Sequence, residues 1–171
     1  MLIIRRITDT EPASLGPLIK LLQDAVNGGA SVGFLAPLSQ ETAAQYWTST
    51  YGQLHDGRVL WVAELDGRII GSVQLDLCGK ENGRHRAELQ KLIVLGSHRG
   101  QRVSSALLLA AEQFAREHGR TLLVLDTLSA SFAATVYRHR GWEFAGSIPE
   151  YAASPDGQLH ATSYFYKRIA P

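Results

Sequence analysis

The segment from residue 96 to residue 105 gathers glycine, serine and arginine where a strand is expected to enter a helix. It reads Gly96-Ser97-His98-Arg99-Gly100-Gln101-Arg102-Val103-Ser104-Ser105. A helix that begins in such a turn presents unpaired backbone N–H groups at the positive end of its dipole, which suits a phosphate. Arg99 and Arg102 add formal charge there. From the spacing alone, an ordinary helix start with two solvated arginines explains the turn equally well.

Other patterns of nucleotide binding and catalysis are missing. The chain has no GxxxxGK[ST] loop, and its GGASVG segment at 28–33 has Ala30 at the third position of GxGxxG, where that pattern has its second glycine. The histidines at 85, 98, 118 and 139 have neither metal-ligand spacing nor a neighbouring serine or cysteine nucleophile, so we expect no metal site and no catalytic triad. A lone Cys78 excludes an internal disulfide and is expected to act as a small apolar group.

Composition favours one water-soluble domain that spans residues 1–171. Seventeen basic and sixteen acidic residues give a net charge of +1, so we expect neither nucleic acid nor an anionic membrane as a partner. Charge appears by residue 5, and no stretch approaches the roughly 20 apolar residues of a membrane span. No repeat or linker divides the chain, and the expected location is the cytoplasm.

The elements that must position the turn follow from hydrophobic periodicity. Apolar residues from Val103 to Ala115 recur at i, i+3, i+4 and i+7, which predicts a helix that Gly119 ends. Asp66-Gly67 predicts a tight hairpin. The other expected helices are Glu11 to Asn27, Ser39 to about Gly57 and Ser131 to Arg140; the expected strands are 1–7, 59–65, 69–77, 87–95, 121–125, 142–147 and 161–169. This order predicts an α/β fold with one strand-helix-strand crossover in the middle.

Residues 88–144 resemble the central region of the GNAT superfamily of N-acetyltransferases. That family's pattern is an apolar strand, R-G-x-G-x-G/A, an amphipathic helix, a strand and then Y-x-x-x-G-[FW]; here the motifs are Arg99-Gly100-Gln101-Arg102-Val103-Ser104 and Tyr137-Arg138-His139-Arg140-Gly141-Trp142. Three positions depart from it. Arg102 replaces the second glycine, Ser104 replaces the Gly/Ala, and Ala130 stands where many members carry an asparagine, with Ser131 the nearest polar residue.

The resemblance implies a fold and a cofactor. The fold would be a single mixed, mostly antiparallel central sheet with helices on both faces and the crossover at an acetyl-CoA site. The pyrophosphate of acetyl-CoA would sit on the amides of 100–105 and its pantetheine arm beside 92–94, with a backbone N–H near Ile93 or Val94 holding the thioester carbonyl. The expected cofactor-binding residues are Leu92, Ile93, Val94, Arg99, Gly100, Gln101, Arg102, Val103, Ser104 and Ser105.

Three further residues are candidates for catalysis. An alkyl amine with a pKa of about 10 is only about one part in a thousand neutral at pH 7, so a base must remove its proton. Glu88 enters the central strand on the face of Gln90 and Leu92 unless a bulge changes the phase, and Asp126 ends the next strand. Their structural alternatives are a solvated strand end and a helix N-cap. Tyr137 occupies the family's general-acid position, and its alternative is a packed aromatic residue.

Three segments also resemble the tabtoxin-resistance branch of that superfamily: 27–34, 86–92 together with 125–127, and 153–160. This implies a small, amino-acid-like amine as the acetyl acceptor and a role in toxin or antibiotic resistance. Candidate acceptor contacts are Ser31, Phe34, Gln74, Asp76 and Tyr151, each of which is more often an ordinary loop, surface or core residue. Acetylation of protein N-termini and a non-catalytic CoA sensor are the alternatives, and a homodimer is an open option.

Overall fold

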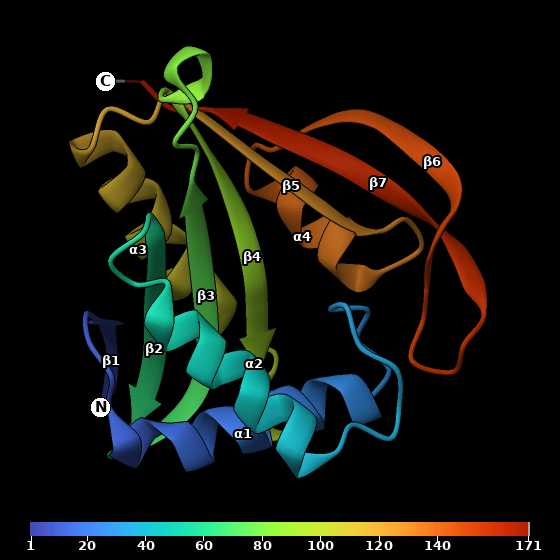
Figure 1. Ribbon diagram of the computed structural model, residues 1–171. Helices are drawn as coiled ribbons and strands as arrows, with labels where there is room; N and C mark the ends of the chain where they lie inside the picture. Colours follow the sequence, from blue (N-terminus) through green and yellow to red (C-terminus); the bar gives the residue numbers. More distant parts are fainter. Residues whose placement is uncertain (171) are drawn as a thin grey trace.

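The computed structural model describes residues 1–170, which form an α/β fold in the expected order of elements (Figure 1). The strands are β1 (Leu2–Ile7), β2 (Arg58–Leu65), β3 (Arg68–Leu77), β4 (Arg86–Val94), β5 (Leu122–Leu128), β6 (Glu143–Ala153) and β7 (Leu159–Arg168). The helices are α1 (Pro12–Asn27), α2 (Gln40–Gly52), α3 (Val103–Glu117) and α4 (Phe132–His139). Short 3-10 turns occupy Glu81–Gly83 and Gly96–His98.

A single sheet runs in the order β1-β2-β3-β4-β5-β7-β6. Five of its neighbouring pairs are antiparallel, and β4 and β5 are parallel because α3 carries the chain between them. The predicted mixed, mostly antiparallel sheet with one crossover is therefore confirmed.

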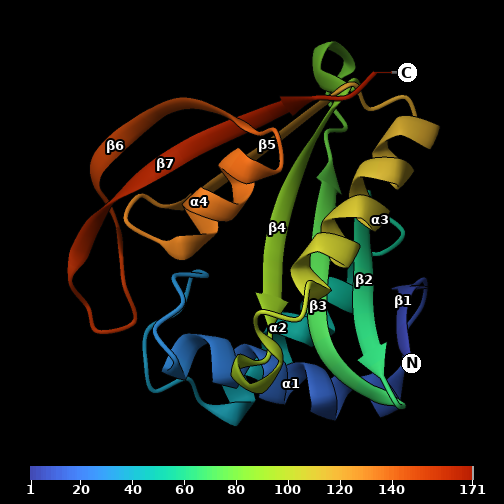
Figure 2. The same ribbon diagram turned by 180° about the vertical axis from the view of Figure 1, so that it is seen from behind.

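Helices cover both faces of the sheet, as predicted (Figures 1 and 2). The buried side of α3 and α4 packs on one face in a core that includes Leu107, Ala111 and Tyr137. The α1 and α2 helices pack on the opposite face around Leu22 and Trp47. The apolar stripe read from the sequence in α3 is thus the stripe that faces the sheet.

Some element ends differ from the sequence expectation. The α2 helix ends at Gly52 rather than near Gly57, because the N–H groups of Asp56 and Arg58 both turn back to the carbonyl of Gln53. The β6 strand runs to Ala153 instead of stopping near Ser147. Most of β6 is exposed, so its pairing with β7 defines the strand and no hydrophobic alternation marks it.

The β4 and β5 strands separate after a short contact. They pair only where Arg86, Ala87 and Glu88 face Leu122, Leu123 and Val124. Beyond that point β5 turns away with β6 and β7, as both views show (Figures 1 and 2). The second half of β4 therefore has no partner strand on its β5 side, and this gap places the site described next.

Candidate active site

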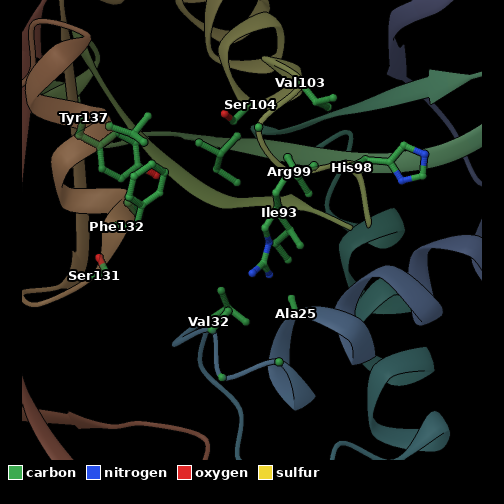
Figure 3. A pocket seen from close by; sticks show the side chains of 18 of the residues that line it. Ala25, Val32, Ile93, His98, Arg99, Val103, Ser104, Ser131, Phe132 and Tyr137 are labelled. Carbon is green, nitrogen blue, oxygen red and sulfur yellow. The ribbon is translucent and has the colours of Figure 1, made fainter. Parts of the chain in front are cut away.

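A cavity of about 350 Å³ lies where β4 and β5 separate. Its walls come from the end of α1, the second half of β4, the turn that leads into α3, and α4 (Figure 3). The lining residues are Ala25, Gly28, Gly29, Ala30, Val32, Leu92, Ile93, Val94, His98, Arg99, Gly100, Arg102, Val103, Ser104, Ser131, Phe132, Ala133, Val136 and Tyr137. The cavity thus has walls from helices on both faces of the sheet.

Eight of the ten residues expected to bind the cofactor line this cavity, and Gln101 and Ser105 do not. Gln101 is exposed in the turn, and the hydroxyl of Ser105 is bonded by the Arg140 guanidinium in a neighbouring depression. No side chain caps the first turn of α3. Because the N–H groups of a first helical turn have no partner within the helix, this end of α3 presents donors to an anion in the cavity.

Arg102 adopts a left-handed backbone conformation at the N-cap of α3, with φ of +62°. Glycine reaches this region without a steric penalty, whereas another L-residue loses about 1–2 kcal/mol there. The conformation gives a physical reason for the glycine of the family pattern at this position. The turn keeps its shape here with an arginine, and gains a positive charge beside the helix N-terminus.

A β-bulge lies in β4 at the cavity wall. Ser72 and Gln74 of β3 are two residues apart, but their partners Ile93 and Gln90 are three apart, so β4 carries one extra residue. Lys91 in this bulge has φ of +49°, and its carbonyl accepts a hydrogen bond from the Ser72 hydroxyl at 3.2 Å. The bulge interrupts the alternation that would put Leu92 on the face of Glu88 and Gln90. It also allows three successive residues, 92 to 94, to line the cavity.

Glu88 and Asp126 lie near the point where the two strands separate. Glu88 is half-buried in the last β4–β5 pair, and it accepts a hydrogen bond from the Gln90 amide at 3.0 Å. The alternative interpretation of Glu88 was a solvated strand end. Its hydrogen bond to Gln90 within β4 differs from that interpretation. Asp126 is exposed on β5, two residues beyond the last pair, and faces Tyr164 in β7. Ser131, not Asp126, caps α4 by accepting the Ala134 N–H at 3.2 Å.

Tyr137 projects from α4 into the wall of the cavity (Figure 3). Its side chain is buried and packs against Trp142 and Phe165, with ring centroids 5.7 Å and 6.2 Å away. Burial, and to a smaller extent the negative charge of Asp126, raises the pKa of the Tyr137 hydroxyl. This hydroxyl therefore stays protonated at neutral pH and is able to donate a proton.

The expected acceptor contacts fall into three groups. Gln74 is buried in a hydrogen-bond network with Tyr46 and Arg58, and Asp76 forms an ion pair of 3.4 Å with the same Arg58. Phe34 packs edge-on against Tyr46, at 5.5 Å between centroids, which brings the α1–α2 loop over this network. On the β5 side, Tyr151 packs against Tyr164, and its hydrogen bond raises the pKa of Tyr164 to about 12. Ser31 is half-buried in the same loop as Phe34.

Several residues of the site carried no recognisable signal in the sequence. Phe132 stands in the cavity wall although its side chain is 82% exposed. Lys91, Arg58 and Tyr46 come from three separate elements and meet only in the folded chain. Lys91 is a cation directly before the apolar run from 92 to 95, and this position was the one available hint.

Two other classes of site are absent from residues 1–170. No group of three or more histidine, cysteine, aspartate or glutamate side chains is arranged to hold a metal ion. No helix in the same residues has the length and apolar character needed to cross a membrane.

Comparisons with known proteins agree with this geometry. A sequence profile of the Acetyltransferase (GNAT) family matches residues 27–142. An uncharacterized N-acetyltransferase of Azospirillum brasilense is 32% identical over 125 residues, which are 72% of this chain and 73% of that protein. N-acetyltransferase 8 of Rattus norvegicus is 39% identical over 92 residues, which are 53% of this chain. The matched region is 41% of the rat protein, so the chain spans less than half the length of that relative.

A structural comparison supports the same assignment of the fold. A Salmonella typhimurium protein solved with its cofactor acetyl-CoA superposes with a TM-score of 0.79 at 17% identity. The superposition covers 100% of this chain and 95% of that one. With the profile match over more than half of its length, the chain belongs to the acetyltransferase (GNAT) family.

Proposed function

We propose that this protein is an acetyl-CoA-dependent N-acetyltransferase that acetylates the primary amine of a small, amino-acid-like molecule. The observation that carries the proposal is one cavity bounded by the free helix start of α3, the unpaired half of β4 and Tyr137. Glu88 and Asp126 are not part of its lining but lie near the point where β4 and β5 separate. Each part answers one requirement of acetyl transfer: an anion site, a carbonyl site, an acid and a base.

The residues present fit acetyl-CoA, which the GNAT family uses. The uncapped first turn of α3 offers N–H groups to the pyrophosphate, and Arg99 and Arg102 supply charge for it. Residues 92–94 supply apolar side chains and a strand edge without a partner on that side, where backbone groups remain free to bind an amide-containing arm. Bound acetyl-CoA supplies the activated acetyl group as a thioester.

The carboxylates of Glu88 and Asp126 are the proposed bases. In the net reaction an N–C bond forms, the C–S bond breaks, and one proton passes from the amine to the thiolate. Glu88 or Asp126 accepts the proton from the amine, directly or through one water molecule, and the Tyr137 hydroxyl donates a proton toward the sulfur. Backbone N–H groups of the β4 bulge region hold the carbonyl oxygen as negative charge develops on it.

A contact across the site favours a small acceptor over a protein chain. The Ala36 N–H donates a hydrogen bond of 2.9 Å to the Pro155 carbonyl, which joins the α1–α2 loop to the turn between β6 and β7. Both segments approach each other in the two views of the fold (Figures 1 and 2). An extended peptide needs an open groove between these segments, whereas a compact amine does not. A role in resistance to a toxin or antibiotic, and a cytoplasmic location, stay part of this proposal.

Incubation with acetyl-CoA tests the proposal. Separate panels of small amines and of peptides with free N-termini are to be analysed by mass spectrometry, with release of free thiol as the rate measurement. We expect acetylated small amines and unmodified peptides. Acetylation of peptides alone would identify an N-terminal acetyltransferase, and tight binding of acetyl-CoA without thiol release on any amine would identify a CoA sensor. Either result contradicts the proposal.

A further inference from the structure

Lys91 of β4 lies beside Tyr46, which also contacts the expected acceptor residues Phe34 and Gln74. The Lys91 ammonium has no ionic partner there in the part of the chain that the structure describes. Its Nζ lies 5.4 Å from the centroid of the Tyr46 ring. On the loop side it faces Gly33, where even an added Cβ would stand 3.9 Å from the same Nζ. Within the described residues 1–170, no carboxylate reaches this ammonium at ion-pair distance. A half-buried ammonium that packs on an aromatic face and has no carboxylate at ion-pair distance is incompletely solvated, and an anion would compensate that loss.

Arg58 brings a second positive charge to the same place. Its guanidinium donates to Gln74 at 2.9 Å and to Gln90 at 2.6 Å, and it forms a long ion pair of 3.4 Å with Asp76. Its buried Nε has no partner among the described residues. Burial, followed by the charge of Arg58, lowers the pKa of the Lys91 ammonium. A ligand carboxylate placed between Lys91 and Arg58 would relieve the repulsion between these two cations.

The backbone of Lys91 adopts an energetically unfavourable conformation in the bulge. Its φ of +49° lies in the left-handed region, where a residue other than glycine loses about 1–2 kcal/mol. Such conformations occur disproportionately where the resulting side-chain position is used in binding or catalysis. Glycine would fit the bulge with less strain but would leave Arg58 as the only cation beside Gln74 and Gln90.

We propose that Lys91, assisted by Arg58, binds the carboxylate of the acceptor, which makes the acceptor an amino acid or a related amino carboxylate. This inference rests on the proposed function, since it assigns the acceptor of the same reaction. Glu88 and Asp126 lie close enough for their charges to act on Lys91, without contacting it as an ion pair. The site therefore holds positive groups for a carboxylate beside negative groups for an amine, as a zwitterion requires.

Matched acceptors provide the test. Each amino acid is compared with the amine left by its decarboxylation and with its methyl ester, at saturating acetyl-CoA. For the unmodified protein we expect kcat/KM to be at least about tenfold higher for the amino acid, because a charge-assisted contact is lost with the carboxylate. Equal rates for the acid and its decarboxylated partner would overturn the inference and leave the proposed function standing.

Variants assign the preference to Lys91. Lys91→Met is expected to remove the preference, mainly by raising KM for the amino acid at least about tenfold, with little change in KM for the decarboxylated amine. Lys91→Arg should restore part of it, and Lys20→Met on the exposed face of α1 is the control that should change neither. Equal losses for both members of a pair would show a structural role only and would contradict the proposal.

Two measurements separate the ways in which this test could fail. Circular dichroism and acetyl-CoA binding confirm that Lys91→Met is folded; if it is not, the comparison of acceptor pairs on the unmodified protein decides the inference alone. If neither member of any pair is acetylated although acetyl-CoA binds, the proposed function fails, and the acceptor assignment fails with it.

Discussion

Glu88 and Asp126 carry the same functional group in different surroundings. Glu88 is half-buried and held by the Gln90 amide, whereas Asp126 is exposed on the strand that diverges from β4. A held carboxylate is better placed to accept a proton from an amine in a fixed position, and an exposed one is better placed to pass that proton to water. The two residues can therefore form a short relay.

Conservative substitutions test these carboxylates. Glu88→Gln and Asp126→Asn keep the shape of each side chain but remove the base. Glu88→Gln also keeps an oxygen that can accept the Gln90 hydrogen bond. We expect each to lower kcat by about 10²-fold or more, the usual contribution of a general base. The dissociation constant of acetyl-CoA, measured by calorimetry, should change less than about twofold.

An outcome with both rates unchanged would remove Glu88 and Asp126 as bases. A loss in one variant alone would assign the base to that residue. A large change in acetyl-CoA binding would instead show that the substitution disturbs the cavity.

At single positions, the sequence offers candidate residues but not backbone states. The family motif and the strand positions together make Tyr137, Glu88 and Asp126 candidates, and their roles stay predictions. No pattern revealed that Lys91 and Arg102 adopt left-handed conformations, with φ of +49° and +62°, because both conformations depend on neighbours that are distant or on the turn as a whole. The alternation of side chains along a strand fails at Leu92 because β4 carries one extra residue. The type of that residue does not mark it as a bulge.

The α3 helix depends on a close approach to β3 at Gly71. A Cβ at this position would stand 2.9 Å from the Ile93 carbonyl oxygen and 3.1 Å from Cδ1 of Leu107. Glycine is thus required for packing rather than for its range of φ. The contact fixes the distance between β3, the cavity strand β4 and the first turns of α3, so it sets the geometry of the anion site indirectly.

Gly71→Ala should therefore lower both stability and acetyl-CoA affinity. Overpacking of this kind typically reduces the free energy of unfolding by roughly 1–3 kcal/mol. Urea denaturation measures the first effect and calorimetry the second. Gly52→Ala is the matched control: it is the last residue of α2 with nothing within 4 Å of the added Cβ, and should leave stability unchanged or raise it by up to about 1 kcal/mol. A neutral Gly71→Ala variant would contradict this account of the packing.

Elements with a strongly periodic apolar face were predictable, and those that depend on pairing alone were not. The helical period in α3 and the alternation in β2 and β3 both reflect burial, which the sequence records directly. The length of β6 depends on its ladder with β7, across two irregularities in register, so it could not be read from a pattern of side chains. The separation of β4 and β5 likewise appears only when the strands are placed in space.

For the whole molecule, the cavity lies between β4 and α4, which belong to two groups of elements whose strands meet through only three residue pairs of β4 and β5. A ligand that contacts both α4 and β4 joins these groups and stabilises the folded chain. Acetyl-CoA at 100 times its dissociation constant should add about 2.7 kcal/mol to the free energy of unfolding. For a chain of this size, we expect the melting temperature to rise by roughly 5–10 °C.

Hydrogen exchange checks the location of this effect. Acetyl-CoA should slow exchange at the β4 amides from 92 to 94 and in the first turn of α3, and also in α4. S-acetylpantetheine, which lacks the pyrophosphate, is the control and should protect β4 with little effect on α3. Protection of α3 alone would contradict binding between the two groups of strands.

The unpaired half of β4 also bears on the solubility of the protein. A strand edge with free N–H and C=O groups is normally a point at which chains associate into larger sheets. In this fold that edge lies inside the angle between β4 and β5, with α4 and the end of α1 forming the cavity walls beside it. A narrow linear molecule can reach these groups, but a strand from another protein, with its neighbours attached, is too wide. The fold thus keeps the free backbone groups of β4 available to a ligand without exposing them to strands of other proteins.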